Sequence, residues 1–516
     1  MPPACLFVAH WLAVMAFGFL TTGGTAQAAT WYVAAGGTGT GTSANPFGRV
    51  QDGLNAAQPG DTVTVRPGTY SESIATVRNG TASAPITLRS EGGRGTVTLT
   101  AVGTTARLSH AFHLLDGLVF DGQYGANDLI LVRSGANNLT VRNTEIRRAG
   151  RDCVDMSNQQ NVLFEHDVIH HCIWWNGTTQ VDAHGIVGGP VRNLTIRDTE
   201  IHHVSGDCVQ VDAGRSAPGW DQVLLEGSHL WTGPLPAAEN GMPAGATPGE
   251  NAVDTKSGGT NPRATITLRN IVAHGIRSGF ITNMAAFNLK ENVTVILDGI
   301  TVYDSEIGFR IRGPGSNGGA DVTLMNGVIH TTTYGIRYED NIVMPKVWNT
   351  TFGSNVPNPF FAASSAGTVF DTRNTLVLGG TLPSQAGGGS NRAVSAAAFV
   401  NAAANDYHLA PGSPAIDAGT PLAAVTTDRD GAARPSGAAY DVGAFEYGVS
   451  APPPPAGSAC DLNGDGATNV VDVQGMVNQA IGVAACTADL NRDGACNVID
   501  VQRVVNAALG GQCVSS

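Results

Sequence analysis

The sequence is poor in charged and aromatic residues, which make up 14% and 6% of its 516 residues. A large helical bundle presents many more charged side chains to solvent, so this composition argues against one. Acidic residues outnumber Lys and Arg by 42 to 29, and no basic cluster stands out, which argues against nucleic acid as a partner. Glycine is abundant instead, with 66 residues, as expected for a fold of short strands and turns.

No apolar segment beyond the first 20 residues is long enough to suggest a membrane span. Residues 6–20 form an apolar run that is itself short for one, and small residues follow it up to Ala26-Gln27-Ala28. This order predicts a signal peptide over residues 1–29 and a secreted, extracellular or surface-attached protein with no membrane span in the mature chain.

The body of the chain is a repeat. Aliphatic and aromatic residues occupy one position in seven successive segments: Val141, Phe164, Ile196, Leu225, Leu268, Leu297 and Leu324. Two residues later, each segment carries a residue suited to a tight turn: Asn143, His166, Asp198, Gly227, Asn270, Gly299 and Asn326. A repeat of about 20–45 residues without helical periodicity predicts stacked coils.

A second column of apolar residues follows: Val154, Ile186, Val209, Val253, Phe280, Phe309 and Ile336. Together the columns predict an all-β, right-handed parallel β-helix over residues 30–448, with adjacent coils about 4.8 Å apart. Cys153 and Cys208 share a position two coils apart, too far for a mutual disulfide, so both are expected to be buried thiols. Residues 45–74, with a short capping helix, and 413–447 resemble the first coil and closing segment of secreted bacterial β-helix proteins.

Polar residues at the outward positions beside this second column carry the candidate chemistry. One row reads Asp155, Val187, Gln210, Asp254, Ile281, Arg310 and Arg337, and the other reads Ser157, Gly189, Asp212, Lys256, Asn283, Arg312 and Glu339. Acids lie toward one end, arginines toward the other, and Lys256 lies between them. Such a strip suits β-elimination from a uronic acid, because arginine neutralises the carboxylate and an uncharged lysine takes the α-proton.

Residues 250–257 (ENAVDTKS) resemble the acid–acid–lysine segment of β-helix polysaccharide lyases of the chondroitinase B and alginate lyase family. The resemblance implies Lys256 as base and Arg312 as the neutralising residue, with Arg310 or Arg277 in its place if the register differs. It also implies one Ca²⁺ at the site, and the candidate calcium or substrate contacts are Asp207, Asp212, Glu250 and Asp254.

Three other interpretations stay open. Asp152, His184, Asp207 and the Arg310–Arg312 segment faintly resemble polygalacturonase motifs, which favours a glycoside hydrolase. A strip of rings on another face suits a non-catalytic glycan-binding protein: His170, His202, Trp231, His274, Tyr303 and His330. The outward charges could also be simple surface ion pairs, Asp212 with Lys256 and Arg312 with Glu339.

Residues 449–459 are a proline-rich linker to a duplicated tail over residues 460–513. Two 12-residue segments, 461–472 and 489–500, have oxygen-bearing side chains at positions 1, 3, 5, 9 and 12 and glycine at position 6, the spacing of a calcium loop. The predicted ligands of two Ca²⁺ ions are Asp461, Asn463, Asp465, Asn469, Asp472, Asp489, Asn491, Asp493, Asn497 and Asp500.

Each calcium loop precedes an apolar helical segment, and the pair resembles a type I dockerin. The resemblance implies a cohesin partner, or else docking within the chain. The four tail cysteines, Cys460, Cys486, Cys496 and Cys513, are expected to form disulfides in an exported protein.

Overall fold

The computed structural model describes residues 28–448, except 213, 278, 314–316, 340 and 365–367, and parts of the tail: 459–462, 468, 470–490, 495–508 and 513. The predicted signal peptide therefore lies almost wholly outside the described residues. Among those that are described, no helix has both the length and the apolar character needed to cross a membrane.

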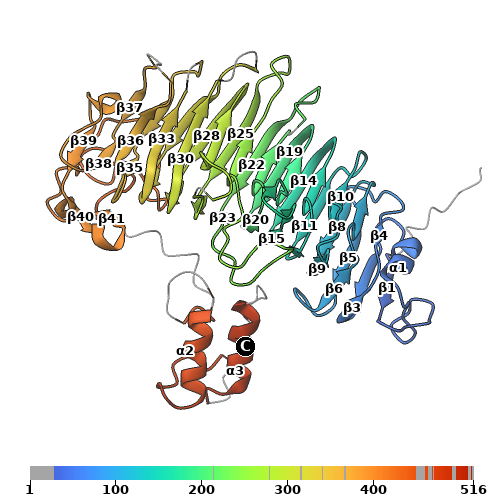
Figure 1. Cartoon of the computed structure of the whole chain (residues 1–516). Coiled ribbons are helices and arrows are strands. Elements are labelled where there is room, and N and C mark those ends of the chain that lie inside the picture. The colour runs from blue at the N-terminus through green and yellow to red at the C-terminus, as the bar shows by residue number, and fades with distance from the viewer. Residues whose placement is uncertain are drawn as a thin grey trace, which may run out of the picture.

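Three long parallel sheets wrap around one core, so that each coil of the chain adds one strand to each sheet (Figure 1). Sheet A holds β1 (Thr30–Val33), β2 (Thr62–Val65), β5 (Ile86–Ser90), β8 (His113–Asp116), β11 (Leu139–Arg142), β14 (Gln159–Glu165), β19 (Val191–Arg197), β22 (Asp221–Glu226), β25 (Ala264–Arg269), β28 (Val293–Asp298), β31 (Asp321–Met325), β34 (Lys346–Trp348) and β37 (Asp371–Arg373).

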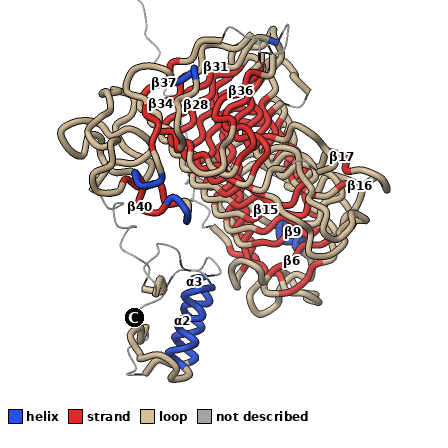
Figure 2. Tube along the Cα trace, turned by 60° about the vertical axis from the view of Figure 1, so that its left-hand side comes forward, coloured by secondary structure: helices blue, strands red, loops and turns tan. Residues whose placement is uncertain are grey.

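Sheet B holds β3 (Gly68–Tyr70), β6 (Val97–Thr100), β9 (Leu118–Asp121), β12 (Glu145–Arg147), β15 (Val168–Cys172), β20 (Glu200–Val204), β23 (His229–Trp231), β26 (Val272–His274), β29 (Thr301–Tyr303), β32 (Val328–Ile329), β35 (Thr351–Phe352), β38 (Leu376–Leu378) and β39 (Arg392–Val394). Sheet C holds β4 (Ile74–Ala75), β7 (Ala106–Leu108), β10 (Ile130–Val132), β13 (Val154–Met156), β18 (Ile186–Gly188), β21 (Val209–Val211), β24 (Val253–Thr255), β27 (Ala285–Lys290), β30 (Ser305–Arg312), β33 (Thr332–Tyr338) and β36 (Asn358–Ala362). The described body is therefore the predicted parallel β-helix, with loops at the corners between the sheets (Figure 2).

The first predicted column is confirmed at every step. Its seven residues pair in register along sheet A, from β11 through β31, and all are buried. The predicted turn column is confirmed as well, because all seven of its residues have φ between 46° and 68°. Asn, Asp and Gly tolerate this left-handed conformation best, which explains their recurrence at the corner.

The second column is confirmed except at Phe280. Val253 of β24 pairs with Phe287 of β27, and Phe287 pairs with Phe309 of β30. Phe280 lies in the preceding corner and is 41% exposed, so the predicted strand at 277–283 is wrong. Residues 285–290 alternate apolar and polar side chains over a longer stretch, and they bury Phe287 completely.

Both ends of the solenoid are covered. Helix α1 (Val50–Ala56) buries Val50 and Leu54 at the first coil, as predicted for the capping helix. At the other end the hairpin of β40 (Phe399–Asn401) and β41 (Asp406–Leu409) contributes to a separate apolar cluster. The closing segment is held by a buried ion pair of Arg434 with Glu446, at 2.7 Å.

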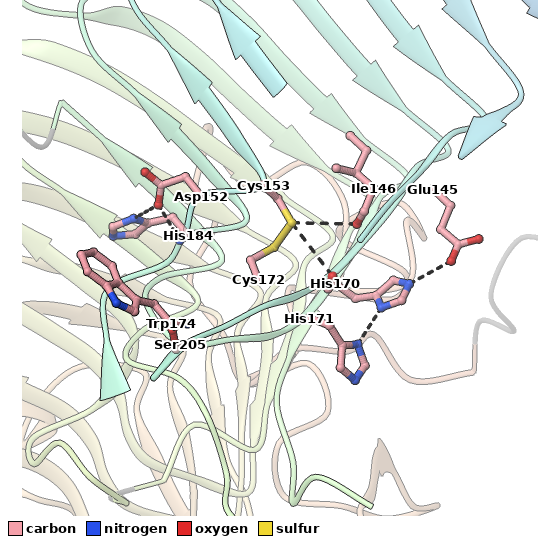
Figure 3. The surroundings of a disulfide bond; sticks show 10 residues. All are labelled: Glu145, Ile146, Asp152, Cys153, His170, His171, Cys172, Trp174, His184 and Ser205. Carbon is pink, nitrogen blue, oxygen red and sulfur yellow. Dashed lines mark hydrogen bonds and ion pairs between the residues drawn. A yellow bond between two sulfur atoms is a disulfide. The ribbon is translucent and has the colours of Figure 1, made fainter. Parts of the chain in front are cut away.

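The cysteine prediction for the body is wrong for one residue. Cys153 forms a disulfide with Cys172, which connects the start of β13 to the end of β15, and only Cys208 is a buried free thiol (Figure 3). Sequence columns compare the same sheet in successive coils, so they could not reveal a bond between neighbouring sheets. The predicted tail disulfides are present, as Cys460–Cys513 and Cys486–Cys496.

The tail contains the two expected helices, α2 (Val470–Ala480) and α3 (Val498–Ala508). Among the ten predicted calcium ligands, Asn463, Asp465, Asn469, Asn491 and Asp493 lie outside the described residues. Asp472 and Asp500 make the same contact in each half: the carboxylate accepts a hydrogen bond from the backbone of Leu462 or Leu490 at 2.8 Å. The sequence duplication is therefore also a structural one.

Candidate active site

The outward charges of sheet C meet on strands β21, β24, β27 and β30. Asp254 pairs in register with Asn288, and Lys290 pairs with Arg312. Extending the β24–β27 register by two residues puts Lys256 beside Lys290. One row on this sheet therefore reads Lys256, Lys290, Arg312 in successive coils, with Lys290 in the place predicted for Asn283.

Two lysines share the carboxylate of Asp254. The ammonium nitrogens of Lys290 and Lys256 lie 2.8 and 3.4 Å from its oxygens. The whole sequence contains three lysines, so two of them are concentrated at one buried acid. Their side chains are 10% and 20% exposed, which leaves both within reach of a molecule lying on the sheet.

The sequence analysis missed Lys290 because it assigned the strand of this coil to residues 277–283, which lie in the corner before β27. A detectable signal existed. Residues 286–290 give small, apolar, polar, apolar and polar side chains, the same order as the other strands of the column. Gly279 and Phe280 have the same small–apolar order, but the match extends over fewer residues. The buried stacking of Phe287 on Phe309, with ring centroids 5.1 Å apart, decides between the two segments.

Asp207 and Glu250 lie beside the lysine pair. The Asp207 carboxylate is fully buried and accepts hydrogen bonds from Asn251 Nδ2 at 2.7 Å and Gln210 Nε2 at 2.5 Å. Burial raises the pKa of Asp207, and the Asp254 charge raises it further. Burial also raises the pKa of Glu250, with a contribution from Asp207. Three neighbouring carboxyl groups therefore compete for the available positive charge.

His184 is a buried cation between Asp152 and Asp207, and Figure 3 shows its contact with Asp152. Its Nδ1 lies 2.7 Å from Asp152, and its Nε2 lies 3.6 Å from Asp207. Burial opposes its charge, but the hydrogen bond with Asp152 and the negative charges around it raise the pKa of His184 to about 9. The imidazolium thus neutralises the carboxylates that the hydrolase interpretation would use as acid and base.

The arginines continue the row beyond Lys290. Arg310 and Arg312 both contact Glu339, each at 2.9 Å. Burial alone would raise the pKa of Glu339, but hydrogen bonds and charge from these two arginines lower it. Two guanidinium groups face the Glu339 carboxylate here, as two ammonium groups face Asp254.

The remaining predicted residues lie apart from this cluster. Asp212 accepts a hydrogen bond from the backbone of Ser216 at 2.9 Å and belongs to the turn after β21; the predicted pairing with Lys256 is wrong, because Lys256 contacts Asp254. Arg277 is exposed in a corner loop and pairs with Asp304 at 2.6 Å. The structure therefore groups Lys256, Arg310, Arg312, Asp207, Glu250 and Asp254, and adds Lys290.

The predicted strip of rings lies on the outer face of sheet B. Successive rings stack on each other with centroids 4.6 to 5.6 Å apart, from His170 through His202, Trp231, His274 and Tyr303 to His330. Because the ring faces cover one another, they are not free to stack on sugars, and that part of the glycan-binding interpretation is wrong. The stack is a structural ladder that joins neighbouring coils.

This ladder predicts loss of stability in acid. Burial, with neighbouring histidines for some members, lowers the pKa of His202 to about 2 and the pKa of His274 and His330 to about 4. An unfolded histidine titrates near 6.5, so below that pH the unfolded chain binds more protons than the folded one. The ladder therefore contributes its full share to folding stability above about pH 6.5, and this contribution is lost as the pH falls toward 4.

We expect the thermal midpoint of unfolding to decrease as the pH is lowered from 7 to 5. His274→Phe keeps a ring between Trp231 and Tyr303 but removes one titrating group, so its midpoint should fall less over the same range. An equal or larger fall for His274→Phe, measured by circular dichroism, would contradict this role of the ladder.

Comparisons with known proteins complete the description. No protein-family model matches the chain, and no curated protein matches it. Among solved structures, it is similar to the pectate lyase Pel9A at 17% identity and a TM-score of 0.44, over 81% of this chain and 96% of that one. An alginate lyase from Paenibacillus sp. str. FPU-7 has 16% identity and a TM-score of 0.41, over 61% and 99%. The exopolygalacturonase of Yersinia enterocolitica has 12% identity and a TM-score of 0.40, over 68% and 78%. At these values the similarity concerns the parallel β-helix and does not decide the reaction.

Proposed function

We propose that this protein is an extracellular polysaccharide lyase that cleaves a uronic-acid-containing polymer by β-elimination. The observation that carries the proposal is the lysine pair on Asp254, continued in the next coil by Arg312 and Arg310. The chain as a whole has a net charge of −13, yet four cationic side chains gather on this strip of sheet C around Asp254 and Glu339. A local basic strip of this kind can attract an acidic polymer against the overall sign.

The reaction needs three things from these side chains. Arg312, assisted by Arg310, neutralises the carboxylate of the uronate ring, which acidifies the neighbouring C–H. An uncharged lysine amine takes that proton, a double bond forms in the ring, and the bond to the leaving oxygen breaks. A lysine ammonium gives its proton to the leaving oxygen.

Lys290 lies between Lys256 and Arg312 in the row, so a ring whose carboxylate contacts Arg312 extends over Lys290 and toward Lys256. We assign proton transfer to this lysine pair, with Asp254 holding both side chains. Glu250 defines the acidic end of the strip and contacts the sugar hydroxyl groups, and the buried carboxylate of Asp207 adds negative charge behind it.

Calcium at this site stays a prediction. The carboxylates of Asp207, Glu250 and Asp254 and the carboxamide of Asn251 are the oxygen donors that Ca²⁺ prefers. In the part of the chain that the structure describes, however, no group of three His, Cys, Asp or Glu side chains has metal-site spacing. Lys256 and Lys290 already occupy Asp254, so the present arrangement does not fit a calcium ion and none of the steps above depends on one.

The decisive assay uses purified protein with alginate, pectate, chondroitin and rhamnogalacturonan. We expect absorbance of an unsaturated uronide to rise with one of them. New reducing ends without that absorbance would indicate hydrolysis around Asp152 and Asp207 instead. Binding without any cleavage would indicate the glycan-binding alternative.

We further propose export and a calcium-binding tail that docks to a cohesin. Three disulfides support an oxidising compartment. The repeated contacts of Asp472 and Asp500 support two equivalent calcium loops. Val498 and Ile499 at the start of α3 are 74% and 48% exposed, which supports an apolar protein partner rather than a solvated end.

Replacing the first ligand of both loops, Asp461→Ala with Asp489→Ala, should abolish calcium binding by the tail, because each change removes a charged oxygen ligand. Titration calorimetry of the full chain measures it, and Asp406→Ala, in the β40–β41 hairpin, serves as the control. Two tightly bound Ca²⁺ ions persisting in the double variant would contradict the tail assignment. Calcium binding that remains beyond the tail would report the predicted site on sheet C.

A further inference from the structure

A second buried charge lies directly behind the lysine pair. Glu291 follows Lys290 in sequence, is 1% exposed and has φ of +72°, a left-handed conformation that is strained for a glutamate. It is the residue at which the chain leaves β27, and its carboxylate is enclosed by two other coils.

The Glu291 carboxylate connects those coils. Arg215, from the turn after β21, contacts it with Nη2 at 2.6 Å and Nε at 3.0 Å. The backbone N–H of Ser257 donates to it at 2.5 Å. Ser257 follows Lys256 and Glu291 follows Lys290. The hydrogen bond between these two residues therefore connects the backbone just after one lysine to the backbone just after the other.

Further bonds hold the two lysine backbones from the same side. Trp220, buried after the Arg215 turn, donates its Nε1 hydrogen to the carbonyl of Lys256 at 2.7 Å. The hydroxyl of Thr255 accepts from the N–H of Lys290 at 2.9 Å and donates to its carbonyl at 3.1 Å. The backbone behind both ammonium groups is therefore fixed by side chains of three successive coils.

We propose that the Arg215–Glu291 ion pair is a positioning device for Lys256 and Lys290. The inference rests on the function proposed above. Only the Glu291 carboxylate of this pair is buried, and the pair brings little net stability, because the hydration that the carboxylate loses offsets its attraction to Arg215. What it does supply is a fixed geometry, and proton transfer depends steeply on the distance between the reacting atoms. Neither residue contacts the substrate, so the pair acts only through the lysines.

The test compares Glu291→Gln and Arg215→Lys with wild type on whichever polymer is cleaved. Glu291→Gln keeps the acceptor oxygen for Ser257 but removes the charge, and kcat should fall about 10- to 100-fold while KM stays within about 2-fold. Arg215→Lys keeps the charge but not the two-point contact, and its kcat should lie between those of wild type and Glu291→Gln. A folded Glu291→Gln or Arg215→Lys with wild-type kcat overturns the proposal; if Glu291→Gln does not fold, Arg215→Lys, whose side chain is 38% exposed, decides alone.

The control is another Arg–Glu ion pair with a buried carboxylate, in the closing segment. Glu446→Gln disrupts the contact with Arg434 in the closing segment, so it should lower the thermal midpoint and leave kcat unchanged. An equal fall of kcat in Glu446→Gln means that the effect is general destabilisation and overturns the positioning role. Lys290→Ala is measured in the same series: if it keeps wild-type turnover, the proposed function fails, whereas an inactive Lys290→Ala beside a fully active Glu291→Gln refutes only the positioning role.

Discussion

Lys290→Ala and Lys256→Ala should each fold normally and lose turnover by about 10²- to 10⁴-fold, the usual contribution of proton transfer by a positioned side chain. The ammonium groups of Lys290 and Lys256 contact Asp254 at 2.8 and 3.4 Å, and Lys290 pairs in register with Arg312. Arginine at either position should not restore activity, because its guanidinium does not lose a proton near neutral pH. The measurement is kcat from the rise in unsaturated product.

The third lysine of the chain provides the matched control. Lys346 is on sheet A and contacts Asp321 at 3.3 Å, with both side chains about 30% exposed. Lys346→Ala should cost no more than about 1 kcal/mol of stability, as a surface pair, and should leave turnover intact. Wild-type kcat in either Lys256→Ala or Lys290→Ala would contradict the proposed lysine pair and would direct attention to Asp152 and Asp207.

The largest effect on stability is expected from the interior stack of sheet C. Phe287→Ala and Phe309→Ala should each lower the free energy of unfolding by about 3–5 kcal/mol, because each leaves a cavity in a rigid core. Their rings are 0% and 1% exposed and stack with centroids 5.1 Å apart. Equilibrium unfolding in urea measures the change.

Phe280→Ala is the control for the register. Phe280 is 41% exposed and contacts Trp175 in the corner loops, so its loss should cost much less than that of Phe287. A cost for Phe280→Ala as large as that for Phe287→Ala would mean that residues 277–283 form the strand after all. That result would also remove Lys290 from the outer row.

These same residues show which features of the fold could be predicted from the sequence. The column from Val141 to Leu324 and its turn residues could be read directly, because strand alternation and left-handed turns are local and recur in every coil. The two helices of the tail could be predicted for the same reason, since their pattern lies within a short duplicated segment, while calcium binding by the loops before them stays a prediction. Lys256 and its acidic neighbours followed from the same alternation.

The sequence by itself therefore determined the β-helix, the capping helix, the calcium-loop pattern and one of the two lysines. Tertiary structure alone decided between Phe280 and Phe287, because both segments alternate and only one can bury its ring against Phe309. That choice placed Lys290 beside Lys256 and Glu291 beneath Ser257. It also decided the Cys153–Cys172 bond, which joins the start of β13 in sheet C to the end of β15 in sheet B. Contacts between coils and between sheets depend on how many residues each corner takes up, and corner length is set by packing in three dimensions, which no repeat within the chain records.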